Sequence, residues 1–371
     1  MDLSQNRFGK QLKSGTNMRN SVRYGHSQSG NGMKTQPRAA APGEKPQKQT
    51  MFIGKRAAIL AFGFILLMVG IDVRFFRGRG LGYSQKRPSQ TRTGPVEVPF
   101  EFVANQIVVE VKIGGKGPYS MLVDTDTDPS AIDLATAKEL GLRLDSRGFP
   151  ASGGGTEANV VQLTRLPTVE IGTVVAKDVA AGGIDLSKLS AKLGKPIQGV
   201  LGYSFLKDRI IQIDYPETKI RFYTESPYPG IQTAPNTVNK IALAFRYEDG
   251  VLVDSVFING QKMKATLDTG SSGTFSLTPE AVTDLGLEEQ AQNGEGEKAV
   301  GYNGEFESKS GLLKSVRIGR LSVESAPASF WPPGTGHDKK KFQVNIGNGF
   351  FKDFIMTFDF RGKVVVFERV D

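Results

Sequence analysis

The sequence has no cysteine and only two histidines among its 371 residues. The absence of cysteine excludes a disulfide, a thiol nucleophile and a thiolate metal site. The two histidines are His26, which lies in a low-complexity segment, and His337. A Ser-His-Asp triad or a site of several histidines is therefore not expected. We predict no metal site and no organic cofactor.

Excess positive charge is missing from most of the chain. The formal net charge is +9. Residues 1–56 carry all of it, because they contain eleven Lys or Arg and two acidic residues. The remainder contains 36 residues of each sign and is neutral. A basic face on the folded part is not implied, so we do not expect nucleic acid as a partner.

The amino-terminal region has few large apolar residues outside one run. Residues 1–50 predict a disordered basic tail, because they cannot bury enough apolar surface to offset the entropy of ordering. Residues 51–76, with an apolar core from Ala57 to Ile71, predict a transmembrane signal anchor. A cleaved signal peptide and a buried core helix are the alternatives. Residues 77–95 read as a linker that acts as a stalk.

The orientation of that anchor is predicted from the basic residues on its two sides. Basic residues on the carboxyl side of the apolar run favour a cytoplasmic domain, whereas the basic tail favours an amino terminus inside the cell. Long carboxy-terminal domains are translocated largely regardless of charge. We expect a single-pass membrane protein whose folded domain is extracytoplasmic, in the periplasm or at the cell surface.

The rest of the chain contains the same pattern twice. Asp124 follows an apolar strand-like segment and is 78 residues before Gly202, and Asp268 follows a similar segment 79 residues before Gly347. An internal duplication of this kind predicts two lobes related by a pseudo-twofold axis. We expect the two aspartates to meet at that axis.

Paired carboxylates provide a specific kind of chemistry. Two carboxylates held a few ångströms apart do not both ionise easily, so they share one proton. One of them then acts as a base while the other acts as an acid, and the pair titrates as a unit. Hydrolysis of a peptide bond by an activated water needs this division of roles.

At these residues the chain resembles the pepsin-like and retropepsin-like aspartic proteases, in the single-chain, two-lobed and bacterial-type membrane-anchored form. Residues 267–272, Leu-Asp-Thr-Gly-Ser-Ser, match the active-site signature of that family. Residues 200–202 and, more weakly, 345–347 match its apolar-apolar-Gly element. The resemblance covers about residues 96 to 370. It implies an all-β fold, a polypeptide substrate and a function that a monomer can perform.

The resemblance also implies roles for residues beside the catalytic pair, Asp124 and Asp268. In that family the first Thr after each Asp crosses to the partner loop, and the hydroxyl at the third place supports the carboxylate. The first role falls to Thr125 and Thr269, the second falls to Thr127 and Ser271, and Gly270 belongs to the same supporting loop. Gly202 and Gly347 are expected to be structural, because each allows close backbone approach beneath a catalytic loop.

One residue departs from the family pattern, since Asp126 stands where glycine is expected. Asp tolerates positive φ better than most residues, so the fold is expected to survive. A third carboxylate would raise the proton affinity of the pair and crowd the cleft. Two functions stay open: an aspartic-type endopeptidase, and a catalytically degenerate protein that binds peptides or partners.

The acidic segment that begins at Asp124 has two other interpretations, and neither is favoured. A calcium-binding loop over residues 124–135 fails because Pro129 replaces its glycine. A haloacid-dehalogenase-like phosphatase would need repeated strand-helix crossovers, which the strand-rich duplication does not predict.

Short strand-like segments begin at Val96, and we expect lobes over residues 96–228 and 237–371. Helices are predicted over residues 133–140, 184–193 and 278–285. Each copy has a glycine-rich stretch between its catalytic loop and its apolar-Gly element, where a flap over the cleft is expected. The possible flap residues are Gly153, Gly154 and Gly155 in the first copy and Tyr302 in the second; ordinary surface turns are the alternative.

Overall fold

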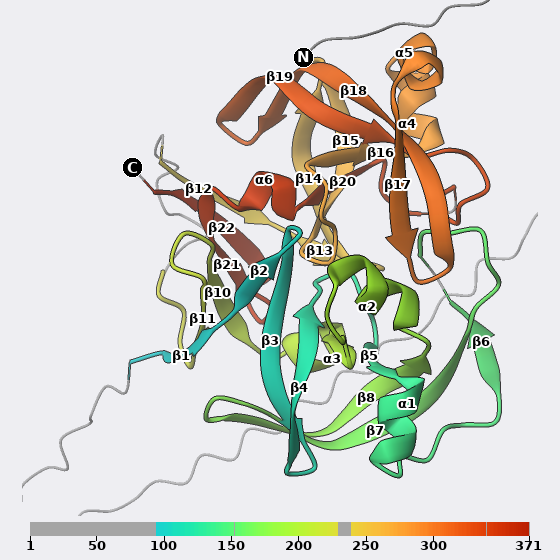
Figure 1. Cartoon of the computed structure of the whole chain (residues 1–371). Coiled ribbons are helices and arrows are strands. Elements are labelled where there is room, and N and C mark those ends of the chain that lie inside the picture. Colours follow the sequence, from blue (N-terminus) through green and yellow to red (C-terminus); the bar gives the residue numbers. More distant parts are fainter. Residues whose placement is uncertain (1–93, 152, 229–238, 339, 371) are drawn as a thin grey trace, which may run out of the picture. The chain divides into compact units, whose positions relative to one another are not determined.

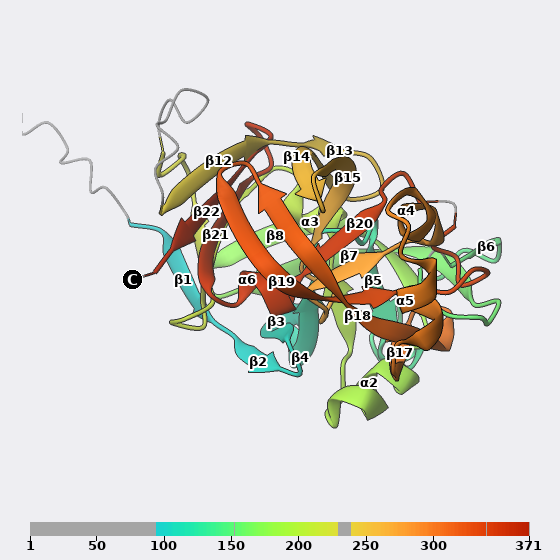
Figure 2. The same cartoon turned by 90° about the horizontal axis from the view of Figure 1, so that it is seen from above.

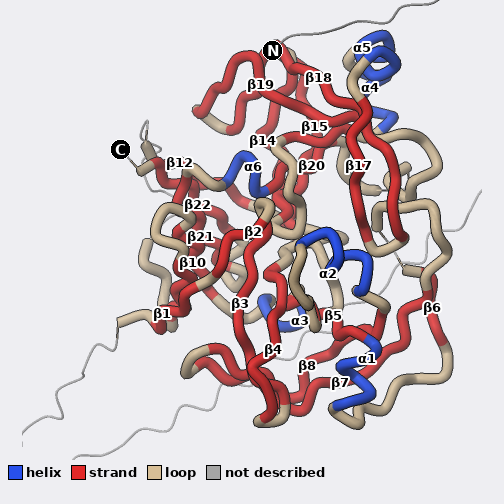
Figure 3. The backbone as a smooth tube through the Cα atoms, viewed as in Figure 1, coloured by secondary structure: helices blue, strands red, loops and turns tan. Residues whose placement is uncertain are grey.

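The computed structural model describes residues 94–151, 153–228, 239–338 and 340–370. Strands dominate this part of the chain and its helices are short (Figure 3). The predicted tail, the predicted anchor and nearly all of the predicted linker lie outside the described residues. Among the residues that are described, none of the helices combines the length and the apolar character needed to span a membrane.

The amino-terminal lobe is built on an eight-stranded sheet (Figure 1). Its strands are β2 (Glu101–Val103), β3 (Gln106–Ile113), β4 (Lys116–Val123), β5 (Ser130–Asp133), β6 (Gly148–Pro150), β7 (Val160–Ile171), β8 (Val174–Ile184) and β9 (Gly199–Leu201). Their spatial order is β2-β3-β4-β9-β5-β8-β7-β6. The pairs β4–β9 and β5–β8 are parallel, and the other neighbouring pairs are antiparallel.

The carboxy-terminal lobe repeats this sheet strand for strand. Its strands are β13 (Arg246–Tyr247), β14 (Val251–Ile258), β15 (Gln261–Asp268), β16 (Phe275–Leu277), β17 (Gly296–Gly301), β18 (Gly304–Ile318), β19 (Leu321–Phe330) and β20 (Val344–Gly347). Their order is β13-β14-β15-β20-β16-β19-β18-β17, with β15–β20 and β16–β19 parallel. The predicted duplication is therefore present in the topology, and the prediction of an all-β, two-lobed protein is confirmed.

A third sheet contains strands from both lobes. Its members are β1 (Val96–Pro99), β10 (Ile210–Asp214), β11 (Lys219–Tyr223), β12 (Lys240–Ala244), β21 (Phe354–Asp359) and β22 (Val364–Arg369). The order is β1-β11-β10-β21-β22-β12. Figure 2 shows β12, β22 and β21 next to one another when the molecule is seen from above. The antiparallel pair β10–β21 joins the lobes through backbone hydrogen bonds.

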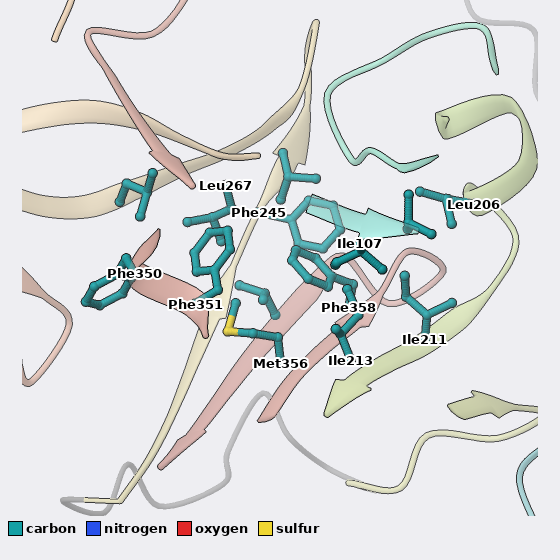
Figure 4. Packing of buried hydrophobic residues seen from close by; sticks show 14 of the residues in the cluster. Ile107, Leu206, Ile211, Ile213, Phe245, Leu267, Phe350, Phe351, Met356 and Phe358 are labelled. Carbon is teal, nitrogen blue, oxygen red and sulfur yellow. The ribbon is translucent and has the colours of Figure 1, made fainter. Parts of the chain in front are cut away.

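The main buried cluster contains side chains from this shared sheet and from β4 and β15. Ile211 and Ile213 are two residues apart on β10, so their side chains point to the same face of the sheet. Phe358 and Met356 lie opposite them on β21. Figure 4 shows these four side chains and Leu267 as members of one buried cluster. All five are at most 1% exposed, and burial stabilises each by about 1.5–3 kcal/mol. Because Leu267 directly precedes Asp268, this packing also anchors a catalytic loop.

The helices begin at recognisable caps. The Asp133 carboxylate accepts hydrogen bonds from two amides at the start of α1, and the Thr278 hydroxyl accepts from the Ala281 amide at the start of α4. The prediction for the second helix was wrong at its start, because β8 continues to Ile184 and α2 begins at Ser187. The helices are α1 (Leu134–Glu139), α2 (Ser187–Leu193), α3 (Tyr203–Leu206), α4 (Pro279–Asp284), α5 (Glu288–Asn293) and α6 (Asn348–Phe351).

Candidate active site

The two aspartates occupy equivalent places at the ends of central strands. Asp124 directly follows β4, and Asp268 is the last residue of β15. A Cβ atom added to Gly202 would lie 2.2 Å from the carbonyl oxygen of Thr127, and one added to Gly347 would lie 2.6 Å from that of Ser271. Each glycine thus lets its strand run directly beneath a catalytic loop, which is the role predicted for both.

Two threonines tie the catalytic loops together. The Thr125 hydroxyl donates to the Leu267 carbonyl at 2.6 Å, and the Thr269 hydroxyl donates to the Val123 carbonyl at 2.8 Å. Each hydroxyl also accepts the backbone amide of the other threonine at 3.1 Å. Both threonines have 0% exposure. This reciprocal set of four hydrogen bonds brings together Thr125 and Thr269, and with them the aspartates that precede them.

The Asp124 carboxylate is 7% exposed and is held mainly by its own loop. Its Oδ1 accepts the amides of Asp126 at 2.8 Å and Thr127 at 3.0 Å. Its Oδ2 accepts the Thr127 hydroxyl at 2.5 Å, and the Tyr302 hydroxyl lies 3.3 Å from the same oxygen. These hydrogen bonds hold the Asp124 carboxylate in one orientation in the site.

The Asp268 carboxylate has different support. Its Oδ1 accepts the Gly270 amide at 2.7 Å, and its Oδ2 accepts the side-chain amide of Asn345 at 2.6 Å. In this lobe a side chain from β20, rather than the hydroxyl of Ser271, supports the second oxygen. Burial first, and then the negative charge of Asp124, raise the pKa of Asp268 to about 7.

The loop that carries Asp268 packs directly on the other aspartate. A Cβ atom added to Gly270 would lie 2.2 Å from Oδ2 of Asp124. Gly270 has no positive φ, so glycine is needed at this position for space rather than for backbone conformation. The contact and the electrostatic effect of Asp124 on Asp268 place both carboxylates in a single site.

Asp126 turns its side chain into the opposite lobe. The Thr266 hydroxyl donates to its two carboxylate oxygens at 2.8 and 2.7 Å, and the Val251 amide donates to Oδ1 at 3.1 Å. Burial, followed by the charges of Asp268 and Asp124, raises the pKa of Asp126 well above its ordinary value. Asp126 has no positive φ either. The departure from glycine therefore adds a tether between the lobes.

The aspartates line a cleft of about 680 Å³ between the lobes. Trp331 stacks on His337 in its wall, with ring centroids 3.6 Å apart, and Phe306 lies next to this pair. Burial lowers the pKa of His337 to about 4, so the imidazole is neutral near pH 7. This aromatic wall presents apolar surface beside the dyad.

The two predicted flap segments meet above this cleft. Residues 301–304 form the tip of the hairpin between β17 and β18, which Figure 1 shows reaching from the carboxy-terminal lobe toward α2 and β6. The tip residue Asn303 donates its amide to the Gly154 carbonyl at 2.9 Å and accepts the Glu157 amide at 2.8 Å. A glycine-rich segment of one lobe is thus paired with the hairpin of the other.

Two β lobes joined by a shared sheet, with an aspartate on each of two paired Asp-Thr loops, define the class of two-lobed acid-protease folds. A family model described as "Aspartyl protease" matches residues 109–205 and 255–350, together more than half of the chain. The chain therefore belongs to the aspartyl protease family, and the family predicted from the sequence is confirmed. Each matched segment contains one of the two aspartates.

The search of solved structures gives a retropepsin-like aspartic protease from Rickettsia conorii. The similarity covers 35% of this chain and 90% of that chain, with 17% sequence identity and a TM-score of 0.25. No curated protein matches the chain.

Proposed function

We propose that this protein is an aspartic-type endopeptidase in which Asp124 and Asp268 bind one water between them. One carboxylate takes a proton from the water as it attacks the peptide carbonyl, and the other donates a proton toward the carbonyl oxygen. The main support is the reciprocal pairing of Thr125 and Thr269, which brings one aspartate from each lobe into one cleft. With the anchor predicted over residues 51–76, the peptidase would act at a membrane, outside the cytoplasm.

The alternative function is a degenerate lobe pair that binds peptides or partners without cleaving them. The sequence feature that suggests this alternative is Asp126, which stands where the family has glycine. The carboxylate of Asp126 is bonded to Thr266 and Val251 in the opposite lobe. Its amide donates to Asp124 as the Gly270 amide donates to Asp268. Asp126 therefore gives little physical reason for inactivity.

Cleavage of a peptide library by the purified full-length chain, from pH 3 to pH 8, tests this proposal. We expect Asp124→Ala and Asp268→Ala each to lower the cleavage rate by about 10²–10⁴-fold, because the base or the acid is lost. Cleavage should also decline as the pH rises through about 7, because the pKa of Asp268 is raised to about 7 and the pair then loses its shared proton.

The matched control is Asp353→Ala, which removes an exposed carboxylate on a different loop. Cleavage that survives the Asp268→Ala substitution would contradict the proposed dyad. A wild-type chain that binds peptides of the library and cleaves none would support the alternative function.

A further inference from the structure

The hairpin tip of residues 301–304, here named the lid, is held to the opposite lobe by several hydrogen bonds. Besides its two backbone bonds, Asn303 donates its side-chain amide to the carbonyls of Ala151 at 3.0 Å and Gly153 at 3.3 Å. The Asn159 side chain donates to the Tyr302 carbonyl at 2.7 Å. These bonds fix the backbone on both sides of the Tyr302 side chain.

Tyr302 extends from the lid to the catalytic loop of the amino-terminal lobe. Its hydroxyl lies 2.8 Å from the Thr127 hydroxyl and 3.3 Å from Oδ2 of Asp124. Burial, and next the negative charge of Asp124, raise the pKa of Tyr302 well above its ordinary value. The phenol is therefore protonated and acts as a donor at every pH at which the protein is expected to work.

The direction of these hydrogen bonds follows from counting hydrogens. The Thr127 hydroxyl has one hydrogen and donates it to Asp124 at 2.5 Å. In the short contact between Tyr302 and Thr127, the tyrosine must therefore be the donor. Two hydroxyls thus form a chain that ends on Asp124, and hydrogen bonds in such a chain strengthen one another.

The other aspartate has no equivalent chain. The opposing segment has Gly153 and Gly154 at its paired tip, and glycine has no side chain that could reach Asp268. Asp268 instead receives one backbone amide and one side-chain amide. The lid therefore extends the hydrogen-bond support of only one member of the pair, through Thr127.

We propose that Tyr302 is a positioning residue for the peptidase reaction. When the lid pairs with the opposite lobe, the tyrosine hydroxyl supports Thr127, and through it the carboxylate of Asp124, so that these hydrogen bonds favour Asp124 as the base of the pair. This inference rests on the proposed peptidase function.

Other charged groups act on the same site and are present in any pH experiment. Asp126 and Asp268 interact electrostatically with Asp124, and Lys340 acts on Asp268. Beside the lid, the carboxylate of Glu157 lies close to Gly304 and forms an ion pair with Lys188. The experiment therefore compares variants that leave all of these groups unchanged.

The first measurement is the pH dependence of kcat/KM for full-length wild type and Tyr302→Phe. Removal of the hydroxyl should displace the acidic limb of the profile by about one pH unit toward higher pH, so that activity at acid pH falls about tenfold. The matched control is Tyr223→Phe, which removes a hydroxyl that donates to the neutral Gln212 side chain at 3.2 Å in the shared sheet. Its profile should keep the wild-type limb.

An unchanged acidic limb in Tyr302→Phe would overturn the proposal. So would a variant that is more active than wild type at every pH, because the tyrosine would then only obstruct the site.

The second measurement needs no catalysis, so it separates this inference from the proposed function. The loss of melting temperature caused by Tyr302→Phe should be about 3 °C at pH 7 and should shrink toward pH 3. The reason is that a donor to a carboxylate loses most of its effect once that carboxylate is protonated. Tyr223→Phe should show a loss that does not depend on pH. If the loss for Tyr302→Phe is equally independent of pH, the proposal is wrong even for a protein that cleaves nothing.

Discussion

The two catalytic loops are alike where they touch each other and different where they hold their carboxylates. Thr125 and Thr269 make the same two kinds of bond in both directions. By contrast, Asp124 is supported by the hydroxyl of Thr127, whereas Asp268 is supported by the amide of Asn345. The symmetric contact builds the site, and the asymmetric support distinguishes the two carboxylates.

The symmetric part of this comparison should produce the largest effect. Thr125→Val and Thr269→Val each remove a buried donor and leave one carbonyl and one amide unpaired. We expect each variant to lower the free energy of unfolding by about 3 kcal/mol, equally in both lobes. Urea unfolding of the full-length chain measures this effect.

The control for that comparison is Thr168→Val, because the Thr168 hydroxyl makes only a long contact of 3.5 Å with Glu170. A clear difference between the costs of Thr125→Val and Thr269→Val would show that one lobe depends on the contact more than the other. The double variant should cost less than the sum of the two, since both residues share one network.

Making the first loop match the second should cost stability rather than increase activity. Asp126→Gly removes the acceptor of the Val251 amide and the Thr266 hydroxyl, both of which belong to fully buried residues. We expect a loss of about 2 kcal/mol in the free energy of unfolding. Asp126→Asn keeps one side-chain oxygen as an acceptor and should lose less.

The cost of Asp126→Gly should also depend on pH. The pKa of Asp126 is raised in the folded state, so this residue contributes most to stability below its unfolded pKa of about 3.9. That contribution is lost as the pH rises through the folded pKa, and the cost of the substitution should shrink accordingly. Unfolding at several pH values measures it. A gain in peptide cleavage by Asp126→Gly would instead indicate that Asp126 silences the first loop.

The smallest effect should come from the two hydroxyls at the third place after each aspartate. Thr127→Ala removes a bond of 2.5 Å to Asp124 and should lower kcat/KM about tenfold, which corresponds to about 1.4 kcal/mol. Ser271→Ala serves as the matched variant and should change kcat/KM less than about twofold, because Asn345 supports Asp268 instead. Equal losses of kcat/KM in both variants would contradict this prediction, and would instead support the equivalent roles of Thr127 and Ser271 that the family resemblance implies.

Local patterns in the sequence predicted much of the fold. The apolar segments 106–113 and 210–214 form the strands β3 and β10. The Thr-Pro start of α4 follows directly from capping chemistry. The start of α2 was misread because the end of β8 is Ala-Ala-Gly-Gly-Ile, which has neither strand alternation nor a helix cap. Its strand state depends on pairing with β5 and β7, which no local pattern encodes.

Local sequence patterns likewise predicted only part of the site. The two aspartates and their threonines were recognisable because a repeated motif lies within a few residues of each. The orientation of Asp126 was not, because its partners are 125 and 140 residues away in the opposite lobe. Asn345 gave one weak signal, a polar residue where the first copy has Val200. The contact of Tyr302 with Thr127 and Asp124 could not be predicted, because it depends on how the whole β17–β18 hairpin is placed against the other lobe.

The shared sheet has a consequence for any attempt to divide this chain. The strand Ile210–Asp214 is buried along its whole length and pairs residue for residue with residues 355–359 of the other lobe. Either half produced alone would present one of these strands as a bare, largely apolar edge, which is a template for pairing with another molecule. The two halves are therefore obligate neighbours, and a single half is expected to associate or aggregate rather than persist as a separate folded unit.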